Sequence, residues 1–435
     1  MQISDERPLF RPRRYRPNPY VLLILLVLVI AAASWAYSII HGLETGEVQP
    51  LFAATATPTR TVDSYLQEAA AFFEAGDLVS SIAAFEDALR VDPDNAEVLA
   101  ELARVQTYYS SLLTPDRKTA LLDSALENIN RAVELDPMNS DAHAVRALVL
   151  DWNSAYADTQ EEQDEMLLLA YEASVRAVSL DNQNALALAY QAEVLLDQFK
   201  WTQARQLAEL ALNMEPNAMD THRVFAYVLE STANYSQAID EYKKAAEINP
   251  NFTYLYIKIG QNYRQLQLYE DALDYFDRAA TINEVNGIQD PLPYIAIAKT
   301  YSRDGEFFIA ARNIQRALEF DPTNADTFGQ LGIVYFRSRN YEGSIPAFKC
   351  AIEGCTAEET MTTLGEPLGL ELGQPVNGLA LNDFTAVYYY TYGSVLAALD
   401  QCAEAVPILQ QVADRYPDDP VAMSIVQEGL VICGQ

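Results

Sequence analysis

The sequence predicts an all-α protein, in which one transmembrane helix is followed by a solenoid of about nine helical hairpins and a capping helix. Two observations predict this fold. Pro-centred turns recur after apolar helical stretches, and Pro216 and Pro250 are 34 residues apart. An uncharged run of 20 residues, 21–40, precedes these turns. A repeat of this length is typical of solenoids, and the run is long enough to cross a bilayer as a helix.

The composition limits the classes of function. The 435 residues include 61 Asp and Glu against 29 Lys and Arg, for a net charge of -32. This balance argues against nucleic acid as a partner, because phosphate binding needs clustered cations. Half of the residues are apolar, which is enough for a packed interior. The chain has three His and four Cys and lacks the usual phosphate, zinc and dithiol motifs, so we expect no enzyme, cofactor or metal site.

The charges around the apolar run predict its orientation. Residues 1–20 hold five Arg against two acids, and the positive-inside rule keeps this basic segment in the cytoplasm. We expect a single-pass protein of the cytoplasmic (inner) membrane, with the span at 21–41, a flexible tether at 42–61 and the remainder extracytoplasmic. A cleaved signal peptide is the alternative, because small residues suited to cleavage follow the apolar core.

Each hairpin shows a fixed pattern of large and small residues. The sixth unit reads Tyr256, Gly260, Tyr263, Ala272, Phe276 and Ala279. This pattern resembles the tetratricopeptide repeat, in which small residues let two helices approach closely and aromatic residues fill the gap to the next hairpin. The resemblance implies a right-handed superhelical solenoid over 62–417, closed by a capping helix over 418–435.

The repeat is interrupted at three places. Units 2 and 3 are longer than the others, and we expect their extra residues in the turns near 107–117 and 152–163. Units 8 and 9 are separated by residues 357–383, which we expect to form a loop or a small hairpin. This insertion is either a surface excursion or a docking loop for a partner.

Cysteine and histidine positions suggest structural roles. We expect disulfides between Cys402 and Cys433, which lie at the same end of two antiparallel helices, and between Cys350 and Cys355. Free buried thiols are the alternative. His143 and His222 occupy the fourth position of the first helix of a unit, where a packing residue is expected.

The resemblance implies that ligands, often extended peptides, bind the concave groove lined by the first helix of each unit. In units 5 to 8 the corresponding positions hold Arg223, Tyr227, Tyr254, Gln261, Arg264, Lys299, Arg303, Phe336 and Arg337. We expect an acidic or C-terminal segment of a protein partner to bind there through Arg. The alternative is that these cations pair with Asp and Glu on neighbouring helices.

These features favour a non-catalytic extracytoplasmic scaffold that binds protein or peptide partners in cell-envelope assembly. A substrate-binding or regulatory subunit of a membrane enzyme complex, such as a glycan synthase or secretion machinery, is the alternative. Co-purification of a fixed catalytic subunit would favour the second hypothesis.

Overall fold

The computed structural model describes residues 18–44, 60–113, 115–157, 159–365 and 372–435. The chain divides into two compact units, Met1–Arg60 and Thr61–Gln435. Residues 1–17 and 45–59, which include most of the expected cytoplasmic segment and most of the expected tether, lie outside the described residues.

The first unit contains the apolar helix α1, Pro19–Glu44. Its stretch Pro19–Ser38 has a mean hydropathy of 2.4. By length and composition, this stretch is sufficient to cross a membrane. A signal sequence near the N-terminus has the same length and composition.

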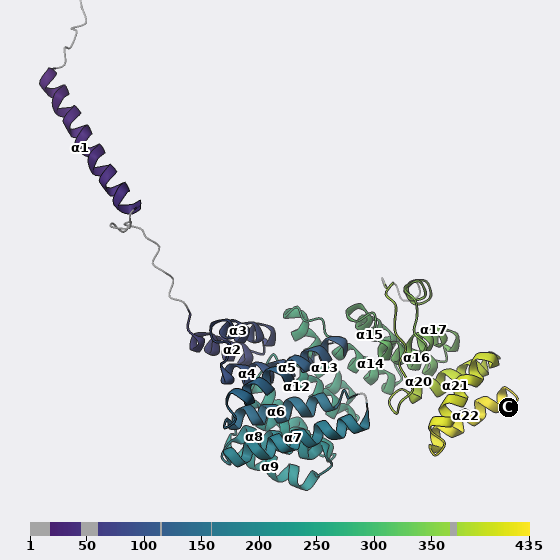
Figure 1. Ribbon diagram of the computed structural model, residues 1–435. Coiled ribbons are helices and arrows are strands. Elements are labelled where there is room, and N and C mark those ends of the chain that lie inside the picture. The colour runs from purple at the N-terminus through teal and green to yellow at the C-terminus, as the bar shows by residue number, and fades with distance from the viewer. Residues whose placement is uncertain (1–17, 45–59, 114, 158, 366–371) are drawn as a thin grey trace, which may run out of the picture. The chain divides into compact units, whose positions relative to one another are not determined.

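The second unit is built from paired helices, as the all-α prediction requires (Figure 1). Within its described residues, nine hairpins follow one another and a single helix packs on the last of them. In each hairpin we call the first helix A and the second helix B. The hairpins are α2(Val62–Glu74)–α3(Leu78–Val91), α4(Ala96–Ser110)–α5(Pro115–Leu135), α6(Ser140–Ser154)–α7(Gln160–Leu180), α8(Ala185–Asp197)–α9(Trp201–Met214), α10(Met219–Ser231)–α11(Tyr235–Ile248), α12(Thr253–Gln265)–α13(Tyr269–Val285), α14(Leu292–Asp304)–α15(Phe307–Phe320), α16(Ala325–Arg337)–α17(Tyr341–Ile352) and α20(Ala386–Ala398)–α21(Cys402–Arg415), followed by α22(Pro420–Ile432).

Small residues on helix A allow the close packing of each hairpin. A Cβ atom added to Gly260 would lie 2.5 Å from the ring of Phe276 on the partner helix. At Gly332 the same addition would meet the ring of Phe348 at 2.6 Å. Both rings are fully buried. The small residues of helix A therefore make room for the aromatic rings of helix B, as the sequence pattern predicts.

The fourth residue of helix A also fixes the turn that precedes it. His143 Nε2 lies 3.1 Å from the carbonyl oxygen of Pro137, and His222 Nε2 lies 2.8 Å from that of Pro216. In unit 6 the hydroxyl of Tyr256 donates to the carbonyl of the turn proline in the same way, at 2.8 Å. The two histidines therefore pack against and bind the turn of their own unit.

The expectation of long turns in units 2 and 3 is wrong. The extra residues lengthen the helices instead, since α5 and α7 each contain 21 residues whereas α9 contains 14. The helix α7 begins with Thr159 as its N-cap, and Glu161 and Glu162 lie in its first turn. Both features stabilise the start of a helix, so the added segment extends the helix rather than forming a loop.

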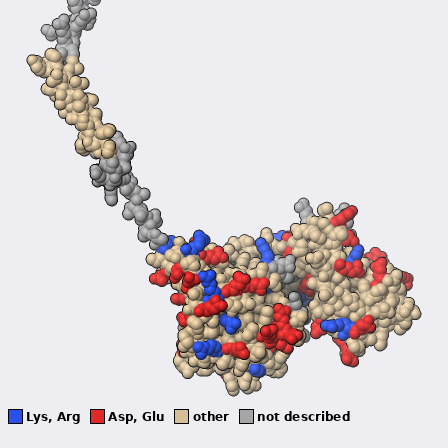
Figure 2. Space-filling model, viewed as in Figure 1, with Lys and Arg blue, Asp and Glu red and all other residues tan. Residues whose placement is uncertain are grey.

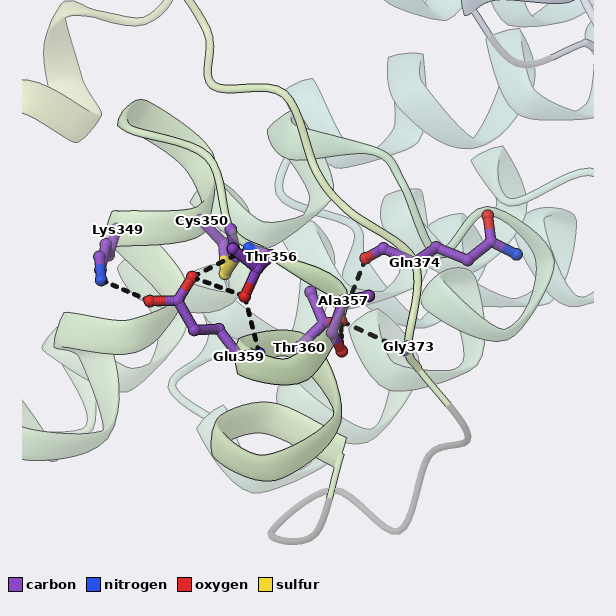
Figure 3. The surroundings of a disulfide bond; sticks show 9 residues. Lys349, Cys350, Thr356, Ala357, Glu359, Thr360, Gly373 and Gln374 are labelled. Carbon is purple, nitrogen blue, oxygen red and sulfur yellow. Dashed lines mark hydrogen bonds and ion pairs between the residues drawn. A yellow bond between two sulfur atoms is a disulfide. The ribbon is translucent and has the colours of Figure 1, made fainter.

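The insertion between units 8 and 9 packs against the end of α17 (Figure 3). It begins with the short helix α18, Ala357–Glu359, and a π-helical segment, Thr360–Gly365. Lys349 donates to Glu359 at 2.8 Å, and the Thr360 hydroxyl accepts a bond from the Gly373 amide at 3.1 Å. On its return the chain forms an isolated antiparallel bridge between Cys355 and Val376. Residues 366–371 lie outside the described part.

All four cysteines are in disulfides. Cys350 and Cys355 pair at a Cα separation of 4.8 Å, which links the end of α17 to the start of the insertion. Cys402 and Cys433 pair at a Cα separation of 5.4 Å and link the start of α21 to the end of α22. These pairs are the two that the sequence suggested.

Candidate functional site

The A helices of units 2 to 6 meet on the inner side of the solenoid, where their side chains contact one another. Asp220 of α10 accepts hydrogen bonds from the hydroxyls of Tyr108 and Tyr190, the latter at 2.9 Å, and from Arg104 at 3.0 Å. Phe252 packs its ring 5.4 Å from that of Tyr108. The inner side of the first six units is therefore largely filled by the protein's own side chains.

Arg223 is one of these packed side chains. The expectation that it lines an open groove is therefore wrong. The side chain is fully buried, with 1% of its surface exposed. Its two terminal nitrogens donate to the two carboxylate oxygens of Glu193, at 2.7 and 2.6 Å. Trp152 donates to the same carboxylate at 3.1 Å. For Arg223, the alternative of pairing with an acid on a neighbouring helix is what the structure shows.

Tyr227 and Tyr254 lie beside this buried pair and face a cavity. Tyr227 donates to Asp197 at 2.8 Å. Lys258 lies 5.1 and 5.8 Å from the ring centroids of Tyr227 and Tyr254, and it forms an ion pair with Glu230 at 3.1 Å. Both tyrosines therefore contact a lysine whose charge is already balanced, and Tyr227 also binds Asp197.

Beyond these packed side chains the inner side contains a cavity, which we call the inner cavity. It has a volume of about 380 Å³ and is bounded by the last turns of α4, α6 and α8, by Lys118 of α5, by α10 and α12, and by the first turns of α14. Asp151, Glu193 and Asp197 form one wall, and Arg264 and Lys299 form part of another. Gln261 also lines it.

Burial changes the protonation of the acidic wall. Burial, together with the neighbouring Asp197 and Glu193, raises the pKa of Asp151 well above its usual range and so favours the protonated carboxyl. The pKa of Asp197 is raised to about 6, mainly by burial, while the hydrogen bond from Tyr227 opposes the shift. Glu193 in the same wall is paired with Arg223.

Next to the inner cavity lies a smaller concavity of about 180 Å³, which shares Arg264, Ile295 and Lys299 with it. Its cations come from three successive A helices: Arg264 from α12, Lys299 and Arg303 from α14, and Arg337 from α16. We call these four residues the cationic groove. Among the residues that the structure describes, none of the four forms an ion pair with a carboxylate.

The cations of the groove repel one another. Burial and, to a smaller extent, the charge of Arg303 lower the pKa of Arg264 to about 10. The pKa of Lys299 is also lowered, mainly by burial; the charge of Asp326 opposes this shift, and the charges of Arg264 and Arg303 add to it. Arg264 donates to the carbonyl of Ala296 at 3.1 Å, and its Nε has no partner. An anion in the groove would relieve this repulsion.

The remaining groove residues take different places. Arg303 and Arg337 are exposed, and Arg337 donates to the hydroxyl of Ser302 at 3.2 Å. Phe336 is half-buried and packs its ring 5.8 Å from that of Tyr341, so it belongs to the contact between α16 and α17. Of the nine expected residues, the structure thus gathers the four cations into one concavity and places Tyr227, Tyr254 and Gln261 at the adjoining cavity.

The three residues of the acidic wall were not among the expected site residues, although they occupy positions of the repeat that face the groove. Asp151 and Trp152 occupy the twelfth and thirteenth positions of unit 3, and Glu193 and Asp197 the ninth and thirteenth of unit 4. These are groove positions in the same pattern that yields Arg264 and Lys299. Within the described residues, no group of three or more His, Cys, Asp or Glu is arranged to hold a metal ion.

The fold and this inner surface define a helical-repeat protein with a partly filled concave face. A tetratricopeptide repeat family model matches residues 224–252 and 253–286, and a second one matches residues 388–419. These are units 5, 6 and 9 of the structure. The chain therefore contains tetratricopeptide repeats, a fold suited to protein–protein interaction.

Similar proteins include two from eukaryotes. The chain is 23% identical over 139 residues to anaphase-promoting complex subunit 3 of Schizosaccharomyces pombe, covering 32% of this chain and 20% of that protein. It is 24% identical over 137 residues to BBSome complex member BBS4 of Bos taurus, covering 32% and 25%. The chain thus spans a quarter or less of the length of these relatives. Among solved structures, yeast Tom70 is 12% identical, with 85% of this chain and 89% of that chain covered and a TM-score of 0.49.

Proposed function

We propose that this protein is a non-catalytic scaffold whose cationic groove binds an acidic segment of a protein partner. The observation that carries the proposal is the unpaired state of Arg264, Lys299, Arg303 and Arg337 within the described residues. In a chain of net charge -32, four neighbouring cations would ordinarily find carboxylate partners. Here they converge on one concavity instead.

The geometry of the groove suits a peptide better than a small ion. The cations come from three successive A helices, so they follow the axis of the solenoid over α12, α14 and α16. An extended acidic segment places successive carboxylates along such a track. Arg forms charge-assisted bonds with a carboxylate through two nitrogens at once, which favours Arg264, Arg303 and Arg337 as the principal contacts.

The rest of the surface disfavours non-specific attraction of anions. Figure 2 shows Asp and Glu side chains distributed over the visible face of residues 61–435, alongside fewer Lys and Arg. This charge repels an acidic chain at long range, so binding must come from contacts in the groove itself. We therefore expect the affinity to depend strongly on the four named cations and on ionic strength.

We further propose that α1 anchors the protein in the cytoplasmic membrane, with the repeats on the extracytoplasmic side and a role in cell-envelope assembly. The apolar stretch of α1, the five Arg before it and the two disulfides of the repeats support this arrangement. It is tested with tags at both termini: the amino-terminal tag should stay in the membrane fraction, and external protease should remove only the carboxy-terminal tag. Loss of the amino-terminal tag on export would show a cleaved leader instead.

The groove is tested by fluorescence anisotropy with a labelled acidic peptide, using the full chain in detergent. The Arg264→Glu/Arg303→Glu variant should weaken binding by at least about tenfold, as expected from the loss of two charge-assisted contacts. Arg205→Glu/Arg312→Glu is the matched control, because it makes the same change of charge on helices α9 and α15. Equal affinity of the two double variants would refute the groove.

A further inference from the structure

The inner cavity differs from the cationic groove beside it because carboxylates as well as cations line it. Its acidic wall contains Asp151, Glu193 and Asp197, the border that it shares with the groove contains Arg264 and Lys299, and Lys118 and Lys258 also line it. A ligand that reaches from the groove into the cavity thus passes from cations to carboxylates within one continuous lining. The acidic wall requires a ligand group that donates hydrogen bonds to its carboxylates.

The three carboxylates differ in whether a cation of the protein already balances their charge. Glu193 is balanced by Arg223, at 2.6 and 2.7 Å. Asp197 receives a hydrogen bond from Tyr227 at 2.8 Å and shares another with the Asp151 carboxyl, but no cation forms an ion pair with it among the described residues. Lys258 lowers the pKa of Asp197 through its charge, yet its ammonium group is paired with Glu230. Asp197 is therefore the unbalanced charge of this wall.

Asp151, which shares a hydrogen bond with Asp197, provides a second indication through its other oxygen. It lines the cavity and has 3% of its surface exposed, and its Oδ1 has no hydrogen-bond partner. Leaving a buried polar atom without a partner is costly, and native proteins rarely do so without a reason. A donor group that settles beside Asp197 can draw this carboxyl into its hydrogen bonds after a small rotation of the side chain.

The aromatic part of the lining favours an ammonium group as that donor. Trp152, Tyr227 and Tyr254 border the cavity, and the faces of aromatic rings attract cations. Lys258 already shows this preference, since its nitrogen lies 5.1 Å from the ring centroid of Tyr227. A carboxylate flanked by aromatic rings is a common setting for a bound ammonium group. A metal ion is a poorer fit, because no set of metal ligands is arranged in the described residues.

We propose that the inner cavity binds a primary ammonium group carried by the same acidic segment that the cationic groove binds. This inference rests on the proposed function, because it names the end group of that segment. The ammonium group sits at Asp197 between the aromatic rings, and the carboxylates that follow it along the peptide reach Arg264, Lys299 and Arg303. The group is either the free amino terminus of the segment or the side chain of a lysine.

Three peptides of one acidic sequence separate these cases by calorimetry with the full chain. The first has a free amino terminus, the second is N-acetylated, and the third is N-acetylated with lysine at its first position. Binding of the first or the third should be tighter than that of the second by about tenfold, the effect of one charged hydrogen bond. Which of the two is tighter identifies the source of the ammonium group.

Two variants then locate the effect. Asp197→Asn removes the charge and keeps an oxygen that accepts from Tyr227, so it should fold and should bind all three peptides with the affinity of the acetylated one. Asp240→Asn, on the exposed side of α11, makes the same change of charge away from the cavity and should leave the preference intact. A melting curve for each variant controls for folding.

The possible failures are distinct. If the acetylated peptide binds wild-type protein as tightly as the other two, the ammonium site is refuted while the groove stands. If none of the three peptides binds, both proposals fall. If Asp197→Asn retains the full preference, the ammonium group binds somewhere else and the assignment to the inner cavity is wrong.

Discussion

The side-chain amide of Asn251 donates a hydrogen bond to the carbonyl oxygen of Ala75 across 2.6 Å, although the two residues are 176 positions apart. Asn249 makes a similar bond to the carbonyl of Phe73 at 3.1 Å. The turn before α12 thus binds the residues that end α2. These two hydrogen bonds bring unit 1 into contact with the start of unit 6. A long peptide cannot lie along the inner side of these units, which leaves α12, α14 and α16 as the open part of the concave surface.

The close approach at Gly76 predicts that a single methyl group weakens this closure. Gly76 has φ = +75°, and an added Cβ would lie 2.6 Å from the Cβ of Asn251. Gly76→Ala should therefore lower the stability of unit 1 by the cost of a left-handed alanine, about 1 kcal/mol, and by roughly 1 to 3 kcal/mol more for the clash. Hydrogen exchange of α2 and α3 measures this loss.

Gly305 provides a matched control for that substitution. It occupies the equivalent turn of unit 7 at φ = +90°, with no atom within 4 Å of an added Cβ. Gly305→Ala should show the conformational cost without the clash. If the two variants lose the same stability, the contact between units 1 and 6 contributes nothing and the closed arrangement is not maintained in solution.

The buried pair of Arg223 and Glu193 should be sensitive to the loss of either partner. Arg223→Ala leaves the Glu193 carboxylate in the interior without its cation, which should destabilise the protein by about 3 to 5 kcal/mol. Arg205→Ala removes an arginine whose side chain is 45% exposed and pairs with Glu209, and it should cost less than about 1 kcal/mol. Urea unfolding of the two variants compares them. Similar losses would argue against a desolvated pair at Arg223.

Asp290 predicts a dependence of stability on pH. Burial raises its pKa to about 7, while bonds from Leu292 and Asn283 and the charge of Lys118 oppose the shift. Because the folded pKa exceeds the unfolded one, the protonated carboxyl stabilises the fold fully below about pH 4, and this stabilisation is lost as the pH rises through 7. Between pH 5 and 8 the loss should be roughly 2 to 3 kcal/mol.

Asp290→Asn should remove that component. The Oδ1 of Asn283 has no partner, so a flipped Asn283 amide can accept a bond from an asparagine at position 290. The variant should match wild type near pH 5 and be more stable at pH 8, as urea midpoints at both values would show. A variant that is less stable at pH 8 would contradict the raised pKa.

The disulfide between Cys402 and Cys433 should hold the capping helix. Closing a loop with a sequence separation of 31 stabilises a fold by about 3 to 4 kcal/mol in the chain-entropy account. Cys402→Ala/Cys433→Ala should increase hydrogen exchange of α22 and α21 and leave that of α4 to α9 unchanged. Cys350→Ala/Cys355→Ala is the comparison, and its effect should be confined to α17 and the insertion. Unchanged exchange of α22 in the first variant would show that packing alone holds it.

Much of the fold could be predicted from the sequence because the repeat pattern is local. The spacing of Gly260 and Phe276 within one unit already determines how two helices pack. The pattern does not predict the lengthened helices of units 2 and 3, because extra residues in a repeat can form either a loop or additional helical turns. The closure between Asn251 and Ala75 has no local signal, because it depends on the curvature that accumulates over six units.

The site could be predicted only in part for the same reason. Groove positions identify which residues face inward, and they selected Arg264 and Lys299. They do not show whether an inward residue meets a ligand or another helix across the turn, and Arg223 meets Glu193. The distinction between a filled and an open part of one concave surface appears only when the units are assembled.

The most direct test of the central claim is to map where an acidic peptide binds. A peptide carrying a photoreactive diazirine is crosslinked to the full chain, and the attachment sites are located by mass spectrometry. We predict crosslinks in α12, α14 and α16, with few in α2 to α5, and their loss in Arg264→Glu/Arg303→Glu. Crosslinks spread over the outer helices, or unchanged in that variant, would contradict the account.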